Sequence, residues 1–221
     1  MDCGMATESA DSPARSDELD ARAVERLVFF SDAVIAIIIT LMVLEVRLPQ
    51  LPEHAGDAAL RSALAALGPK YHAVLLSFCV IGLFWMVHHR RFNCVLRVDV
   101  GVVCLNLMFL LTIACVPFAT AVMAEHGGLT SVLLYAGVLT AASLTSALLW
   151  WSVGRESIVG PNPEALQEMR IATLMSLTSA AFFIASMGIA FLSTSVAQWS
   201  WFLVFGTNWI ARELYTRYRP Q

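Results

Sequence analysis

The chain has 221 residues, of which 58% are hydrophobic and only 14% are charged, and its mean hydropathy is +0.69. Soluble domains usually carry about 25% charged residues, so the composition excludes an ordinary soluble protein and favours a membrane protein. The net charge of −3, without a block of basic residues, gives no sign of nucleic-acid binding.

The first 24 residues are polar and mildly acidic, and they lack the basic start and apolar centre of a secretory signal. We expect residues 1–24 to form a cytoplasmic tail with little fixed structure, apart from a helix that starts near Asp17–Glu25. Residues 25–221 are then expected to form a single membrane domain.

Six apolar segments follow the tail, and each is long enough to cross a bilayer as a helix, which takes about 20 residues. Their continuous apolar character favours helices over strands. Pro117 is expected to kink the third segment or to mark where it leaves the lipid. The sequence therefore predicts an all-α membrane protein with six transmembrane helices. The expected spans are residues 27–46, 71–87, 98–123, 130–151, 171–192 and 196–215.

Two longer connections separate these spans. Asp57–Leu67 is expected to form a small surface helix that Gly68 and Pro69 close. The second connection contains the turn Gly160–Pro163, which precedes a helix start with Glu164 in its first turn.

The basic residues orient the helices. With a cytoplasmic N-terminus, 11 basic residues fall inside and three fall outside, which together are the 14 in the chain. Cytoplasmic segments of membrane proteins are enriched in Lys and Arg, so both termini are expected to be cytoplasmic. The three outside are Arg47, Arg61 and Lys70.

The first span lies within Arg26–Glu45, which reads RLVFFSDAVIAIIITLMVLE. Ile37, Leu41 and Leu44 share one narrow stripe, because helical residues three and four apart are neighbours. Phe30 falls on the same stripe, and Thr40 lies about 60° to one side of Ile37. Such a stripe is also typical of ordinary helix packing or of contact with lipid.

Ser31 and Asp32 point away from this stripe. A carboxylate at the centre of a membrane helix costs about 2.5–3.5 kcal/mol, and less near an end, so Asp32 needs a partner or a polar boundary. Arg26 is six residues away and does not share its face. We therefore expect a partner on another helix or subunit, the alternative being an aspartate that reaches the polar boundary.

The second span ends in FWMVHHRRFN. Trp85 and His88 are three residues apart on one helix face, and the Trp85 indole is a hydrogen-bond donor. Adjacent histidines are potential metal ligands, partners for the Arg26–Asp32 region or ordinary boundary residues. Without a third ligand at a suitable spacing we expect neither a metal site nor a cofactor. The five cysteines also show no metal-ligand spacing.

The sequence has no enzyme signature, since it lacks G-x-S-x-G, H-E-x-x-H and a phosphate-binding glycine loop. It also lacks T-V-G-Y-G, so a carbonyl-lined potassium filter of that kind is excluded. The fifth span is rich in Ala, Ser, Thr and Gly, which favours close packing between helices.

The motif R-x-x-x-F-S-D at Arg26–Asp32 resembles the signature of the transmembrane protein 175 family of potassium channels. The resemblance continues through AIIITLMVLE, through the W-x-x-H of Trp85–His88, and through the six-helix plan of residues 27–219. Animal members of that family have two six-helix repeats, whereas this chain is similar to the prokaryotic members with one.

The resemblance implies a homotetramer in which the first helix of each subunit lines a central pore. It implies a hydrophobic constriction at Ile37, Leu41 and Leu44, and a selectivity layer at Thr40. Glu45 lies at the expected pore mouth, either concentrating cations or as a plain solvated charge. The implied network of helix and subunit contacts comprises Arg26, Phe30, Ser31, Asp32, Trp85, His88 and His89.

We therefore expect a modestly potassium-selective cation channel, not an enzyme, in the plasma membrane of a prokaryote. Its expected partners are copies of itself, membrane lipid and permeating potassium ions. Two alternatives remain open. One is a proton-coupled secondary transporter in which Asp32 and His88 relay protons. The other is a non-conducting membrane scaffold.

Overall fold

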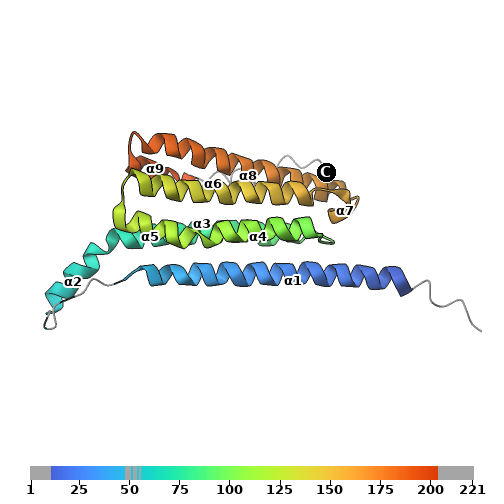
Figure 1. Ribbon diagram of the computed structural model, residues 1–221, viewed down its shortest axis with the longest axis horizontal. Coiled ribbons are helices and arrows are strands. Elements are labelled where there is room, and N and C mark those ends of the chain that lie inside the picture. Colours follow the sequence, from blue (N-terminus) through green and yellow to red (C-terminus); the bar gives the residue numbers. More distant parts are fainter. Residues whose placement is uncertain (1–10, 48–50, 52–53, 55, 204–221) are drawn as a thin grey trace, which may run out of the picture.

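The computed structural model describes residues 11–203 except 48–50, 52–53 and 55, and the described residues form helices and short connections (Figure 1). The first helix, α1 (Asp11–Leu41), continues into the 3-10 turn η1 (Met42–Glu45). The other helices are α2 (Asp57–Ala66), α3 (Gly68–Phe92), α4 (Val100–Ala114), α5 (Val116–His126), α6 (Leu129–Val153), α7 (Glu156–Val159), α8 (Pro163–Ala190) and α9 (Thr194–Ser200).

In the part of the chain that the structure describes, five helical segments are long and apolar enough to cross a membrane. They are Arg15–Glu45, Gly68–Phe92, Val100–His126, Leu129–Val153 and Pro163–Ala190, and they match the first five expected spans. The all-helical class is thus confirmed. Most of the sixth expected span, 196–215, lies outside the described residues; its described part, 196–203, includes the end of α9.

The third span is interrupted at Cys115, where α4 ends and α5 begins. Pro117 lies in the first turn of α5. In an unbroken helix its ring meets the carbonyl group of Ile113, and it supplies no N–H. At the start of a new helix neither property is costly, because that N–H has no helical partner. The expected effect of Pro117 on this span is confirmed.

Two helix ends differ from expectation. Helix α1 begins at Asp11, six residues before the expected start at Asp17. Gly68 and Pro69 do not lie beyond the helices but form the first turn of α3, so the second span is longer than residues 71–87. Proline fits the first turn of a helix, which explains why the pair starts α3.

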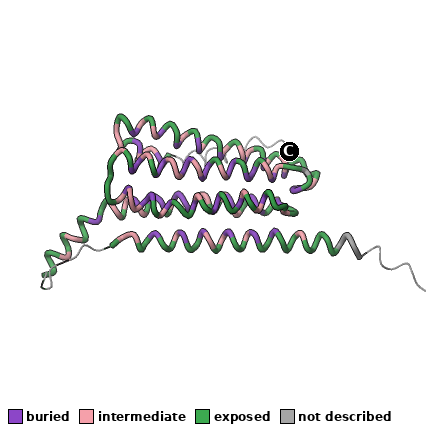
Figure 2. Tube along the Cα trace, in the orientation of Figure 1, coloured by how far each residue is buried: buried purple, intermediate pink, exposed green. Residues whose placement is uncertain are grey.

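The helices form a layered bundle whose long members run side by side (Figure 1). Helix α6 packs against α4, α5 and α8, while α1 packs against α3 and α4 along one side of the bundle. The N-terminal part of α1 extends past the ends of the other long helices, and α2 projects from the opposite end. One side of α1 is therefore in contact with the bundle and the other is open (Figure 2).

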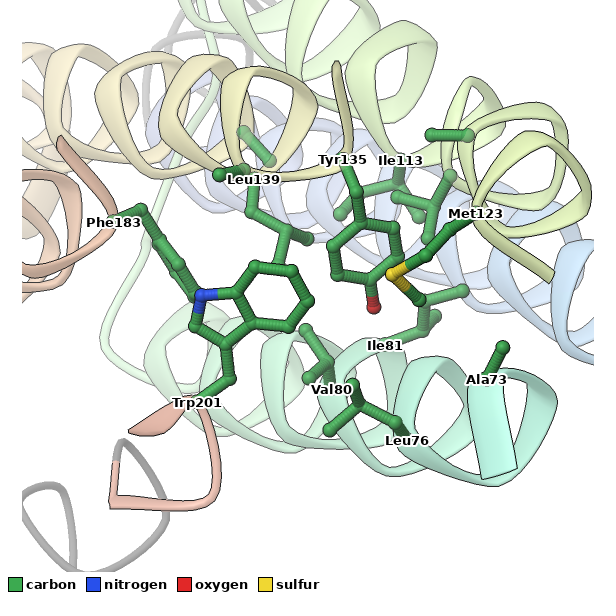
Figure 3. Close-up of a cluster of buried hydrophobic side chains, with 14 of the residues drawn as sticks. Ala73, Leu76, Val80, Ile81, Ile113, Met123, Tyr135, Leu139, Phe183 and Trp201 are labelled. Atoms are coloured by element: carbon green, nitrogen blue, oxygen red, sulfur yellow. The ribbon is translucent and has the colours of Figure 1, made fainter. Parts of the chain in front are cut away.

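The core joins helices that are distant in sequence (Figure 3). The rings of Tyr135 and Trp201 stack with 4.9 Å between their centroids. The Tyr135 hydroxyl lies 2.8 Å from Ser77 Oγ, and Ser77 Oγ lies 2.8 Å from Thr120 Oγ1. Trp201 Nε1 donates to Ser186 Oγ at 2.9 Å. Pairing these buried polar groups offsets their desolvation, which holds α3, α5, α6 and α8 in one arrangement.

Candidate ion pathway and its anchoring network

Helix α1 has an inner face that contacts the bundle. Its residues recur every three or four positions and each is at most 8% exposed. All of them except Ser31 belong to two hydrophobic clusters with the neighbouring helices. This spacing is that of one side of a helix, so the rotation of α1 about its axis is fixed by packing. The inner face consists of Val24, Leu27, Ser31, Ile35, Ile38 and Met42.

Most of the remaining surface of α1 is exposed, and we call one row of its exposed residues the outer stripe. It consists of Leu19, Ala23, Arg26, Phe30, Ala33, Ile37, Thr40, Leu41 and Leu44. Ile37 is 59% exposed, Leu41 46% and Leu44 65%. All the residues expected at the constriction therefore lie on the open side of the helix. The Thr40 hydroxyl is also there and donates to the carbonyl oxygen of Ile37 at 2.8 Å.

Asp32 faces α3, away from the outer stripe, and is bonded to that helix through both carboxylate oxygens. Trp85 Nε1 donates to Oδ1 at 2.8 Å, and His89 Nδ1 lies 3.0 Å from Oδ2. Trp85 and His89 are four residues apart on α3, so both reach the same carboxylate. The three side chains form a clamp between α1 and α3, and we refer to them as the Asp32 clamp.

His88 is not part of the Asp32 clamp, contrary to the expectation for the W-x-x-H pair. It is buried, with its ring stacked 4.8 Å from that of Phe109 and in edge contact with Phe92 and Trp150. Residues three and four positions apart both share a helix face, so spacing alone does not separate His88 from His89. Burial decides between them, because α3 turns His88 into the bundle.

Ser31 bonds α1 to α4. Its hydroxyl donates to the carbonyl oxygen of Leu27 at 2.8 Å and accepts from Asn106 Nδ2 at 2.9 Å. Asn106 was not among the residues that the sequence singled out. A signal for it exists, because it is the one amide side chain in the apolar segment Val100–Ala114, and buried polar residues in membrane helices usually have a partner.

Arg26, Phe30 and Glu45 have no such contacts with the residues that the structure describes. Arg26 is exposed and forms no ion pair or hydrogen bond with another described side chain, and Phe30 is 48% exposed. Glu45 ends η1 and its carboxylate pairs with no described residue. The structure therefore brings together Ser31, Asp32, Trp85 and His89 of the expected network, and leaves Arg26 and Phe30 on the open side.

A second polar contact lies where α4 begins. Asp99 Oδ1 accepts from the N–H of Val102 at 2.8 Å, which caps α4, and Asp99 Oδ2 accepts from Arg155 Nη2 at 2.9 Å. The Val102 N–H and then the Arg155 guanidinium hold the pKa of Asp99 below its ordinary value. Arg97 pairs with Asp20 of α1 at 3.7 Å at the same end of the bundle. These contacts position the connections at one end of the helices.

Comparison with known proteins gives a consistent result. A family model described as endosomal/lysosomal potassium channel TMEM175 matches residues 26–117. A potassium channel of Streptomyces collinus is 34% identical over 174 residues, which cover 76% of this chain and 82% of that protein. A zebrafish (Danio rerio) endosomal/lysosomal proton channel TMEM175 is 28% identical over 144 residues, covering 64% of this chain and 27% of the relative.

A solved structure shares the fold. The crystal structure of a lysosomal potassium-selective channel TMEM175 homologue from Chamaesiphon minutus superposes with a TM-score of 0.71 and 28% sequence identity. The match covers 88% of this chain and 97% of that one. The similarity therefore extends over nearly the whole bundle and includes the segment that carries the outer stripe and the Asp32 clamp.

Proposed function

The chain belongs to the TMEM175 family, and from that premise we propose that four copies form a potassium-permeable pore lined by α1. The family expected from the R-x-x-x-F-S-D motif is confirmed. The chain is accordingly an ion channel of a membrane and not an enzyme. The number of copies, the pore lining and the preference for potassium are parts of the proposal.

The observation that carries the proposal is the contrast between the two faces of α1. The inner face is fixed against α3 and α4, and the outer stripe is open over the apolar part of the helix. A regular row of exposed apolar side chains with one threonine suits a helix that faces an axis shared with copies of itself. Four copies of α1 around that axis place four Ile37 side chains at one level.

Ion passage follows from the chemistry of the stripe. Rings of Ile37, Leu41 and Leu44 offer an ion no ligands, so the constriction either excludes water and closes or widens enough for a hydrated ion. The Thr40 oxygen, which donates its proton to the Ile37 carbonyl, keeps lone pairs for a cation. We propose modest selectivity at Thr40 and a cation-attracting mouth at Glu45.

The Asp32 clamp orients the outer stripe of α1 toward the axis of the proposed pore. It fixes how α1 is rotated relative to α3, and a small rotation moves the outer stripe off the axis. Arg26 and Phe30, exposed in the single chain, are proposed to contact the neighbouring subunit. The distribution of arginines favours a cytoplasmic N-terminus in the plasma membrane of a prokaryote.

Cysteine accessibility tests the pore lining. Ile37 is 59% exposed and Val43, in the η1 continuation of α1, is 63% exposed, but Val43 lies about a third of a turn around the axis from Ile37. In a chain whose native cysteines are replaced, Ile37→Cys is expected to lose potassium flux at least severalfold on reaction with a positively charged thiol reagent. Val43→Cys serves as the matched control and keeps its flux. Equal responses of the two variants contradict a pore lined by the outer stripe.

Proton transport is a second candidate, supported by one contact. His88, which the sequence offered as the partner of Asp32 in a relay, is buried among aromatic rings. His89, however, lies 3.0 Å from Asp32 and is partly exposed. A relay through that pair predicts a current whose reversal potential follows a pH gradient, whereas potassium conduction predicts one that follows the potassium gradient.

A further inference from the structure

Arg91 is a buried cation that plays no part in the proposed pore. It is 6% exposed and lies in the last turn of α3. Its Nη2 lies 3.8 Å from the sulfur of Met175, and its guanidinium carbon lies 5.5 Å from the centre of the Trp150 ring. Its Nη1 has no hydrogen-bond partner among the described residues. A thioether and an aromatic face are weak partners for a buried charge.

No described carboxylate oxygen lies within 4.0 Å of the Arg91 nitrogens. Glu168 of α8 is near enough to act on Arg91 through space. A buried charge without a direct ion pair is strongly disfavoured unless another group of opposite charge reaches it. Arg91 therefore lacks a directly bonded counter-ion among the described residues.

A partly open cavity of about 40 Å³ adjoins Arg91, between α3, α6 and α8. Its other polar lining comes from three hydroxyls, and its apolar lining is Leu83, Phe84, Val87 and Met175. A cavity of this size holds roughly three water-sized groups. The hydroxyl groups belong to Ser146, Ser176 and Ser179.

The three serine hydroxyls are able to serve a ligand. Ser179 Oγ donates to the Met175 carbonyl and Ser176 Oγ to the Ala172 carbonyl, both at 3.0 Å, and Ser146 Oγ lies 3.2 Å from Ser176 Oγ. A hydroxyl rotates about its own bond, so each proton is free to turn from its present acceptor toward an anion. The site thus combines one guanidinium with rotatable hydroxyl donors.

We propose that the Arg91 cavity binds a phosphate-type oxyanion, supplied either by the headgroup of an anionic membrane lipid or by free phosphate. A guanidinium group matches the oxygens of a phosphate, and the cavity has room for about three of them. Helix α3 has 25 residues and is about 37 Å long, which exceeds the hydrocarbon thickness of about 30 Å. Its last turn, with Arg91, therefore reaches the level of the lipid headgroups.

Native mass spectrometry of the full chain tests the site, with phosphatidylglycerol and phosphatidylcholine added in turn at equal concentration. The unsubstituted chain is expected to retain severalfold more phosphatidylglycerol. Ser179→Leu fills the cavity without altering Arg91 and is expected to lose this preference. Thr178→Leu is the matched control, because Thr178 is exposed and its hydroxyl also donates to a helix carbonyl; this variant is expected to keep the preference for phosphatidylglycerol. Arg90→Gln removes an exposed charge beside the site and is expected to keep the preference as well.

Inorganic phosphate separates the two sources. If millimolar phosphate raises the unfolding temperature and displaces phosphatidylglycerol, free phosphate occupies the site. If phosphate has neither effect and the chain still prefers phosphatidylglycerol, the lipid headgroup occupies the site. Equal retention of the two lipids with no effect of phosphate overturns the proposal. An unchanged preference in Ser179→Leu overturns it as well.

Glu168→Gln distinguishes a ligand site from an internal ion pair. If an oxyanion is the partner of Arg91, removing the nearby negative charge is expected to increase phosphatidylglycerol retention severalfold. If this variant unfolds at a lower temperature and retains no more lipid, Glu168 is itself the counter-ion of Arg91 and the proposal is wrong. Lipid retention and unfolding temperature are both measured independently of ion conduction.

Discussion

Both carboxylate oxygens of Asp32 accept hydrogen bonds from α3, which explains how a charge persists in the apolar part of α1. Hydrogen bonds to charged groups contribute about 1.5–3 kcal/mol when buried, and less where water competes. The Asp32 side chain is 26% exposed and that of His89 43%, so the lower end of this range applies. The sequence indicated that Asp32 needs a partner on another helix. It did not indicate His89 over His88, because only tertiary packing turns one of them inward.

A double-mutant cycle tests the Asp32 clamp. Trp85→Phe removes the indole donor and Asp32→Ala removes its acceptor, and each is expected to lower the free energy of unfolding by about 1 kcal/mol or more. Because they share one hydrogen bond, the double variant should lose less than the sum of the two. Thermal unfolding in detergent measures this, with exposed Trp151→Phe as the control. Additive losses contradict the clamp.

At the scale of the helix, α1 has two roles, packing in the bundle and presenting an open surface, and each uses a different side of the helix. Its inner face makes it part of the bundle, and its outer stripe is left for another molecule or for ions. Periodicity predicted that Ile37, Leu41 and Leu44 share a side. It did not predict that this side is the open one, since apolar rows occur equally on packed and open sides of membrane helices. Exposure in the folded chain supplied that distinction.

Helix boundaries were predictable where a residue has a local effect. Pro117 interrupts its span, and Asn162 caps α8 by accepting from the N–H of Glu164 at 3.0 Å. The start of α1 was missed because polar residues at Asp11–Glu25 give no apolar pattern, although pairs such as Glu18 and Arg22, 2.6 Å apart, support a helix. The cap at Asp99 is also local, but it was missed because the expected span began at residue 98 and placed Asp99 inside the helix. Only the ion pair of Asp99 with distant Arg155 depends on tertiary packing.

The cap of α4 has a predictable pH dependence. The folded pKa of Asp99 is lowered, first by the Val102 N–H. Its stabilisation is therefore present above the ordinary value near 3.9 and is lost as the pH falls through the folded pKa. Asp99→Ala is expected to cost about 1 kcal/mol of unfolding free energy at pH 7. The difference from the unsubstituted chain should shrink below about pH 4.

Thermal unfolding between pH 3 and pH 7 measures this dependence. Asp99→Asn is the matched control, because asparagine caps helices about as well as aspartate but has no charge for Arg155. We expect it to lose less stability at pH 7 than Asp99→Ala. A difference between Asp99→Ala and the unsubstituted chain that stays constant down to pH 3 contradicts the role of the ionised carboxylate.

At the scale of the whole molecule, one long side of α1 has no partner among the described helices (Figures 1 and 2). The sequence predicted the helical class and the first five spans, because apolar runs of membrane length are local features. It did not predict which helices pair, because contacts such as Ser77 with Tyr135 or Trp201 with Ser186 join distant segments. The family resemblance, by contrast, rests on a short local motif, and comparison over most of the chain confirms it.

The reversal potential in liposomes, with potassium on one side and sodium on the other at equal pH, tests the central claim most directly. We predict a current that reverses toward the potassium equilibrium potential in the unsubstituted channel. Thr40→Ala should move the reversal potential toward zero, because the proposed selectivity layer loses its oxygen, while current continues. The absence of current, or a reversal potential that follows only an imposed pH gradient, would contradict a potassium-permeable pore.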